Sequence, residues 1–127
     1  MTRRFPARAV ARAQGAFNVV NGAWPLVHLS SFEAVFGRKT DHWLVRTVAG
    51  LLLVNGVVQL SAGTDASGLR LARRLGLGTS LVLGSIDLIY APRRRISRLY
   101  LLDAAAEACL IAAWLACQPL PSRHGRP

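Results

Sequence analysis

The chain has few acidic residues and few cysteines, and each scarcity excludes a class of protein. Its 127 residues include 6 Asp and Glu and 2 Cys, against 16 Lys and Arg. Cys109 and Cys117 lie eight residues apart on one predicted helix, too far to bridge each other, and no metal-ligand spacing surrounds them. No phosphate-binding glycine loop, zinc-finger spacing or internal repeat occurs. The sequence therefore predicts no metal site and identifies no cofactor.

The excess of positive charge does not indicate nucleic-acid binding. The formal net charge is +10, but the basic residues fall in short clusters between long apolar runs instead of forming one patch. The chain is 52% hydrophobic with a mean hydropathy of +0.32, and this combination is typical of membrane proteins with basic loops. We therefore expect the lipid bilayer, and no nucleic acid, as a partner.

Four apolar runs predict four membrane-spanning helices. They cover approximately residues 15–36, 44–63, 75–91 and 99–118. Each run is close to the roughly 20 residues that a helix needs to cross about 30 Å of hydrocarbon. A soluble four-helix bundle is the alternative, but its helices would each keep a polar face, whereas the second run is apolar on nearly all sides. The predicted fold is all-α, a transmembrane four-helix bundle with antiparallel up-and-down passes.

The whole chain is predicted to be one integral membrane domain. Residues 1–12 form a basic N-terminal segment, and residues 119–127 form a tail expected to be disordered. Arg3, Arg4, Arg8 and Arg12 favour a cytoplasmic N-terminus, and four passes then bring the C-terminus to the same side. The basic residues are nearly balanced between the two sides, so insertion in both orientations, with antiparallel pairing, remains an alternative. A second copy of the chain is accordingly a candidate partner.

Five ionisable residues fall inside the predicted spans, where a charged side chain costs about 2.5 to 3.5 kcal/mol unless it has a partner or water. They are Glu33, Arg46, Asp87, Asp103 and Glu107. Because successive passes run in opposite directions, all five are predicted to lie in the half of the bilayer next to the first and third loops. We interpret them as one inward-facing cluster in which Arg46 contacts at least one acid. The alternative is a structural ion pair without a ligand.

Further polar residues in the spans are candidates for a secondary lining of this site. They are His28, Asn18, Asn21, Asn55 and Gln59. Each also has a simpler interpretation, because amides in membrane helices commonly form interhelical hydrogen bonds and a single histidine is commonly a satisfied polar residue. Gly76, Ser80 and Gly84 repeat every four residues, a pattern that predicts close contact with a neighbouring helix, and Asp87 continues that face.

Two segments carry a resemblance to a known group of proteins. They are "NGAWPLVHLSSFEAVFGRKTDHWLVRTVAGLLL" and "SIDLIYAPRRRISRLYLLDAAAEACLIAAW". They resemble small, uncharacterised bacterial integral membrane proteins that share WPL-H-x-x-SFE, G-x-KTD-x-WLVRTV and YLLDAA-x-E segments. The resemblance covers roughly residues 15–115 and implies a four-pass fold in the bacterial inner membrane, but no reaction. Arg38 stands where the group is expected to have proline, which affects the shape of that turn.

Three functions are compatible with this pattern. In the first, the four acids bind or move a cation, a proton or a cationic amphiphile, and Arg46 tunes their charge. In the second, Asp103 and Glu107 act as acid and base of an intramembrane enzyme on a lipophilic substrate. In the third, the protein is a membrane subunit or scaffold without a ligand. The first is preferred because four acids against one arginine leave a surplus of negative charge within the spans. No nucleophile lies beside a base, so no reaction is predicted.

Overall fold

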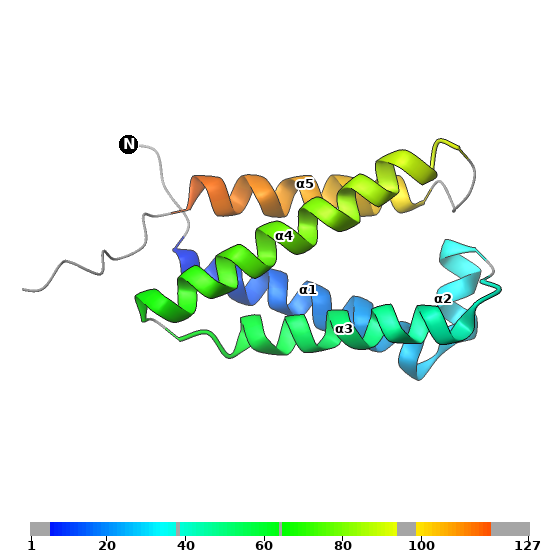
Figure 1. The fold of residues 1–127 in the computed structure, drawn as a ribbon, viewed down its shortest axis with the longest axis horizontal. Coiled ribbons are helices and arrows are strands. Elements are labelled where there is room, and N and C mark those ends of the chain that lie inside the picture. Colours follow the sequence, from blue (N-terminus) through cyan, green and yellow to red (C-terminus); the bar gives the residue numbers. More distant parts are fainter. Residues whose placement is uncertain (1–5, 38, 64, 94–98, 118–127) are drawn as a thin grey trace, which may run out of the picture.

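The computed structural model describes residues 6–37, 39–63, 65–93 and 99–117, which contain α-helices and no strand. The helices are α1 (Ala7–Val27), α2 (Leu29–Phe36), α3 (His42–Leu60), α4 (Ala66–Tyr90) and α5 (Tyr100–Ala116). The four long helices run alternately in opposite directions, with α1 packed on α3, α4 packed on α5, and the two pairs stacked (Figure 1). The predictions of an all-α fold and of up-and-down connections are confirmed.

Two helices begin earlier than the apolar runs predict. α1 begins at Ala7 instead of 15, and α4 begins at Ala66 instead of 75. The Asp65 side chain caps α4, accepting a hydrogen bond from the Gly68 backbone N–H at 2.8 Å. A cap starts a helix whatever the hydrophobicity of the first turns, so α4 includes polar turns that the apolar run omits. Part of the predicted basic segment 1–12 is thus helical, and the predicted tail 119–127 lies outside the described residues.

The first predicted span is two helices and not one. α1 contains Pro25, which lacks a backbone N–H, and it ends at Val27. His28 then leaves the helical region (φ −146°, ψ 80°), and its Nδ1 accepts a hydrogen bond from the Ser31 N–H at 3.2 Å, capping α2. The Trp24 indole donates to the Ser31 hydroxyl at 2.8 Å and closes the turn. His28 is exposed and caps a helix, so the prediction that it lines the site is wrong.

Small residues bring α1 and α3 into backbone contact. A Cβ added to Gly15 would lie 2.9 Å from the Gly56 carbonyl oxygen, and one added to Gly22 would lie 2.5 Å from the Ala49 carbonyl oxygen. Cβ atoms in folded proteins essentially never lie so close to another atom, so side chains at these glycines would force the helices apart. The seven-residue spacing on both helices places the two contacts two turns apart along one interface.

The centre of the bundle is polar. The Gln14 side chain is fully buried and accepts hydrogen bonds from Trp114 Nε1 at 2.6 Å and Gln59 Nε2 at 2.8 Å. It donates to the Ser80 hydroxyl at 2.9 Å and to the Gly76 carbonyl oxygen at 3.0 Å. One amide of α1 therefore binds α3, α4 and α5 and uses every hydrogen bond it can form. A Cβ at Gly76 would collide with this network, which explains why a small residue is needed there.

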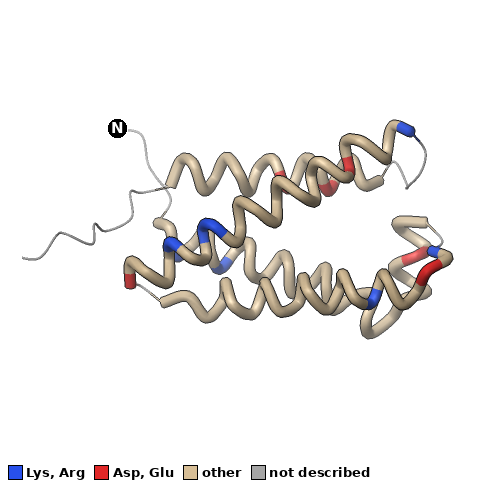
Figure 2. Tube along the Cα trace, viewed as in Figure 1, with Lys and Arg blue, Asp and Glu red and all other residues tan. Residues whose placement is uncertain are grey.

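The surface is apolar, in contrast to the interior. Large hydrophobic side chains are exposed on every long helix, among them Val20 (63%), Leu51 (61%), Leu81 (56%) and Leu102 (69%). By length and composition, one described helix, α3, is able to cross a membrane. α5 is 17 residues long in the described range. The first turns of α4 carry Arg70, Arg73 and Arg74, which place arginines at the end of the bundle where α4 begins (Figure 2).

Replacing Gln14 by leucine should destabilise the bundle by roughly 3 kcal/mol or more, because each buried group left without a partner costs about 1 to 3 kcal/mol. The indole of Trp114 and the amide of Gln59 would both lose their acceptor. Thermal melting of the purified protein in detergent measures the change. Asn55→Leu is the matched control, since that amide is only partly buried and makes one 3.3 Å bond to Thr79. Equal melting temperatures for the two variants would show that the buried network does not hold the helices together.

Candidate functional site

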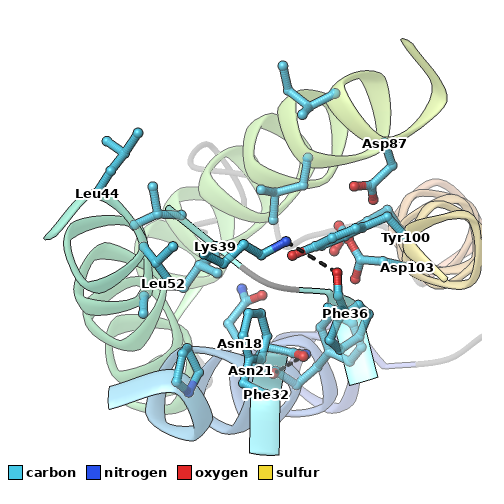
Figure 3. Close-up of a pocket in the computed structure, with 18 residues that line it drawn as sticks. Asn18, Asn21, Phe32, Phe36, Lys39, Leu44, Leu52, Asp87, Tyr100 and Asp103 are labelled. Carbon is cyan, nitrogen blue, oxygen red and sulfur yellow. Dashed lines mark hydrogen bonds between the residues drawn. The ribbon is translucent and has the colours of Figure 1, made fainter. Parts of the chain in front are cut away.

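A cavity of about 400 Å³ opens between the two helix pairs, in the half of the bundle that α2 closes. Figure 3 shows its two sides: Asp87 and Asp103 approach from α4 and α5, and Asn18 and Asn21 from α1. Most of the remaining lining is apolar or aromatic, with Leu52 of α3 as one example. The cavity therefore has one acidic wall, and its other walls are largely apolar.

The acidic wall consists of Asp87 on α4 and Asp103 and Glu107 on α5. Asp87 is 4% exposed and Glu107 is 1% exposed, and Asp103 is half-buried. Asp87 Oδ2 and both carboxyl oxygens of Glu107 are buried without a hydrogen-bond partner in the part of the chain that the structure describes. Buried polar atoms are nearly always paired in folded proteins, because an unpaired one costs free energy. These oxygens thus retain unused capacity to bind a donor or a cation.

The sequence positions these acids by helical spacing. Gly76, Ser80, Gly84 and Asp87 form the buried face of α4 together with two residues nearer its start, so the small-residue face predicted for this helix is confirmed. A Cβ on Gly84 would lie 3.5 Å from the Glu107 Cβ, which shows how closely α4 and α5 approach at this level. Asp87 of α4 and Glu107 of α5 therefore lie at the same interface between these two helices.

Aromatic rings of α2 and α5 line the cavity beside the acids. The Phe36 ring lies 4.8 Å from the Tyr100 ring and 5.1 Å from the Phe32 ring, measured between centroids. Trp24 packs edge-on against Phe32 at 5.5 Å. The change of direction at His28 makes this aromatic lining possible, because α2 turns away from the axis of α1 (Figure 1) and its Phe36 then reaches Tyr100 of α5. An aromatic face beside carboxylates is an environment that favours a cation.

Lys39 completes the lining from the connection between α2 and α3. Its Nζ lies 4.6 Å from the centre of the Tyr100 ring and donates to the Phe36 carbonyl oxygen at 3.3 Å. Figure 3 shows the ammonium between the labelled Tyr100 and Phe36 side chains, directed into the cavity. Burial lowers the pKa of Lys39 from its ordinary value, and the nearby Glu33 carboxylate partly offsets this effect.

Two members of the predicted cluster lie elsewhere. Glu33 Oε2 accepts a hydrogen bond from the Lys39 backbone N–H at 2.7 Å, and its Oε1 is 3.4 Å from His42 Nε2, so Glu33 organises the connection instead of lining the cavity. Arg46 is exposed on α3, and within the described ranges it forms no ion pair. The predicted contact between Arg46 and the acids is therefore not found. The cavity is lined by another face of α3, which carries Val45, Val48 and Leu52.

The polar residues predicted as a secondary lining of the site lie in different parts of the structure. Asn18 lines the cavity and donates to Gln59 Oε1 at 2.8 Å, which joins the cavity to the buried network. Asn21 also lines the cavity, and its amide donates to the Phe17 carbonyl oxygen at 2.9 Å. Gln59 lies in the network, and Asn55 faces a shallow groove between α3 and α4. Of the five, two contribute to the cavity.

Four contributors to the site are not predicted from the sequence: Phe32, Phe36, Lys39 and Tyr100. The two phenylalanines are missed because the prediction treats residues 15–36 as one straight span. The signal that identifies them is Pro25 followed by His28 and two serines, a combination that ends one helix and caps another.

Comparisons with protein-family models, with curated proteins and with solved structures give no match to this chain. The resemblance to small bacterial membrane proteins therefore stays a prediction. The candidate site is supported by its geometry and chemistry.

Replacing Glu107 by methionine should stabilise the empty protein by about 1 to 3 kcal/mol, since a side chain of similar length would fill the same space without an unpaired carboxyl group. Leu110→Met places the same residue one turn further along α5 and should change the stability little. The melting temperatures of both variants in detergent, compared with the parent, measure the effect. A lower melting temperature for Glu107→Met would mean that the carboxyl group is a stabilising part of the bundle.

Proposed function

We propose that this protein is a four-pass protein of the bacterial inner membrane that binds a lipophilic organic cation in the cavity between its helix pairs. The observation that carries the proposal is the acidic wall. Asp87 and Glu107 line a cavity whose other walls are aromatic and apolar, and within the described ranges buried carboxyl oxygens of both residues lack a hydrogen-bond partner. The proposal accounts for the surplus of acids that the sequence places within its predicted spans.

The distribution of polarity supports a membrane location. A soluble bundle buries its large apolar side chains and exposes its polar ones. Here the fully buried side chains include Gln14, Asn18, Gln59 and Glu107, while leucines and valines cover the outside of the long helices. Exposed apolar surface of this extent is stable when lipid covers it. α3 is apolar enough to span by itself, and hydrogen bonds to its neighbours would compensate the polar residues of the other helices.

The shape and chemistry of the cavity favour an organic cation over a metal ion. A hard metal ion such as Ca²⁺ takes about six or more oxygen ligands, and Zn²⁺ takes about four ligands from cysteine, histidine and carboxylate side chains. The described residues contain no group of three or more histidines, cysteines and acids placed to hold one. In contrast, a cation with an apolar body would contact Leu52 and Phe36 on one side and the carboxylates on the other. Low local polarity would strengthen that charge interaction.

The purified protein should bind methyltriphenylphosphonium in nanodiscs of phosphatidylcholine, measured by calorimetric titration against empty nanodiscs. Triphenylphosphine oxide, which is neutral and similar in shape, should bind at least ~10-fold more weakly, because a tenfold ratio corresponds to about 1.4 kcal/mol, well within the strength of one buried charge contact. Asp103→Asn and Glu107→Gln should each lower the affinity for the cation by a similar factor.

Asp65→Asn is the matched control for the loss of one acid. It removes a carboxylate outside the cavity and keeps a residue that can cap α4. The affinity of this variant should equal that of the parent. Equal binding of the cation and the neutral compound, or equal losses for Asp65→Asn and Asp103→Asn, would contradict recognition of charge by the acidic wall. A protein that binds neither compound would favour the scaffold alternative.

The four-pass arrangement predicts opposite accessibility at the two ends of α3. Cysteines introduced at Thr40 and Ser61, both exposed in the structure, are compared in a variant whose Cys109 and Cys117 are replaced by alanine. With cytoplasmic termini, a membrane-impermeant maleimide should label position 40 in intact cells and position 61 only after lysis. Labelling of both positions in intact cells would indicate insertion in both orientations or no membrane passage at α3.

A further inference from the structure

Lys39 is the single lysine of the chain, in which every other residue of the 16 Lys and Arg is arginine. The two side chains differ in a way that matters here. A lysine ammonium is a compact charge on a flexible stem, whereas an arginine guanidinium is a planar group with five donors that tends to stay in a fixed set of hydrogen bonds. A positively charged side chain that has to move into and out of a small cavity is therefore better provided by lysine than by arginine.

The connection between α2 and α3 aims this side chain inward. Gly37 ends α2 with a positive φ of 94°, a conformation that residues with a side chain rarely adopt, and its N–H donates to the Glu33 carbonyl oxygen at 2.7 Å. The Glu33 carboxylate holds the Lys39 backbone N–H at 2.7 Å and lies 3.4 Å from His42. The backbone of Lys39 is thereby anchored, while its side chain is held by one 3.3 Å hydrogen bond and one ring contact.

The Lys39 ammonium lies inside the cavity in which we place the proposed ligand. It lies over the Tyr100 ring at 4.6 Å, and Tyr100 lines the same cavity as Asp87, Asp103 and Glu107. In the part of the chain that the structure describes, Lys39 forms no ion pair with a carboxylate. Its contacts are thus the aromatic face and one carbonyl oxygen, which are contacts that a ligand cation can replace. Its partial burial, which lowers its pKa, shows that water alone does not solvate it.

We infer that Lys39 is a built-in competitor, a tethered cation that occupies the aromatic part of the cavity and that the ligand cation must displace. The inference rests on the proposed function and adds a rule of selectivity to it. A tethered group competes at a high effective concentration that does not depend on the ion content of the medium. Small inorganic cations gain nothing from the apolar walls and would lose this competition. A cation with an apolar body gains the additional contacts that allow it to displace the lysine.

The first test compares Lys39→Gln with Arg46→Gln, both measured by titration with methyltriphenylphosphonium in phosphatidylcholine nanodiscs. Each variant loses one positive charge from the same end of the bundle, but Lys39 lines the cavity and Arg46 is exposed outside it. Removal of the competitor should strengthen binding by ~10-fold in Lys39→Gln, while Arg46→Gln should stay within ~2-fold of the parent, since exposed charges are screened. Lys39→Arg, which keeps a cation in place, should not show the gain.

The second test follows the lysine itself. Acetic anhydride acylates free amines, and Lys39 is the single side-chain amine of the chain, so peptide mass spectrometry reports one side-chain rate with the N-terminal amine as an internal reference. Saturating methyltriphenylphosphonium should raise the acylation rate of Lys39 several-fold relative to that reference, because the displaced ammonium moves into water. Triphenylphosphine oxide at the same concentration should leave the rate unchanged.

The outcomes separate the inference from the proposed function. If the parent binds the cation but Lys39→Gln binds no better than Arg46→Gln, or if the ligand slows the acylation of Lys39, the lysine is a wall of the site and the inference fails while the proposed function stands. If neither the parent nor Lys39→Gln binds the cation, both fail. If Lys39→Gln binds and the parent does not, the competitor is stronger than the probe, and the inference is supported.

Discussion

The buried amide of Gln14 is the interaction on which the arrangement of the four long helices depends. It is hydrogen-bonded to α3, α4 and α5 at once, with four bonds between 2.6 and 3.0 Å. In lipid, apolar side chains gain little by contacting each other, because the hydrocarbon around them is equally apolar. Directional polar contacts and close packing of small residues then decide which helix faces which. Gly76 leaves room for the amide, and Gly15 and Gly22 let α1 touch α3 beside it.

The same bundle has a closed half and an open half. Around Gln14 and Trp114 every polar group of the network is paired, and apolar residues of α1 and α4 such as Val10 and Leu69 pack against the indole. In the other half the helix pairs separate around the cavity, and the acids of α4 and α5 keep unpaired oxygens. Folded proteins pair their buried polar groups except where function requires otherwise. The contrast between the two halves makes the open one the candidate site.

α2 covers this open half and adds aromatic side chains to the lining of the cavity. Without the break at His28, the residues of α2 would continue along α1 and would not face α5. With the break, Phe32 and Phe36 cover the cavity and the following connection brings Lys39 over Tyr100. One short helix therefore provides aromatic side chains and also places a positive charge in the same cavity as the acidic wall. Among the described residues, the basic side chain that lines the cavity together with these acids is thus Lys39 of a connection, and not Arg46 of α3.

Helical periodicity in the sequence is enough to predict an all-α fold with four long helices, and it places Gly76, Ser80, Gly84 and Asp87 on one face of α4. The predicted cluster contains five ionisable residues at one depth, and three of them, Asp87, Asp103 and Glu107, line the cavity. The tertiary structure decided the rest. Arg46 and Glu33 lie at the depth that the cluster requires. The direction in which each side chain points, however, depends on how its helix packs on the neighbouring helices. α1 contacts one side of α3, and the turn at His28 redirects α2. Depth follows from the position of a residue along a helix, whereas the partner of a side chain depends on how four helices pack together.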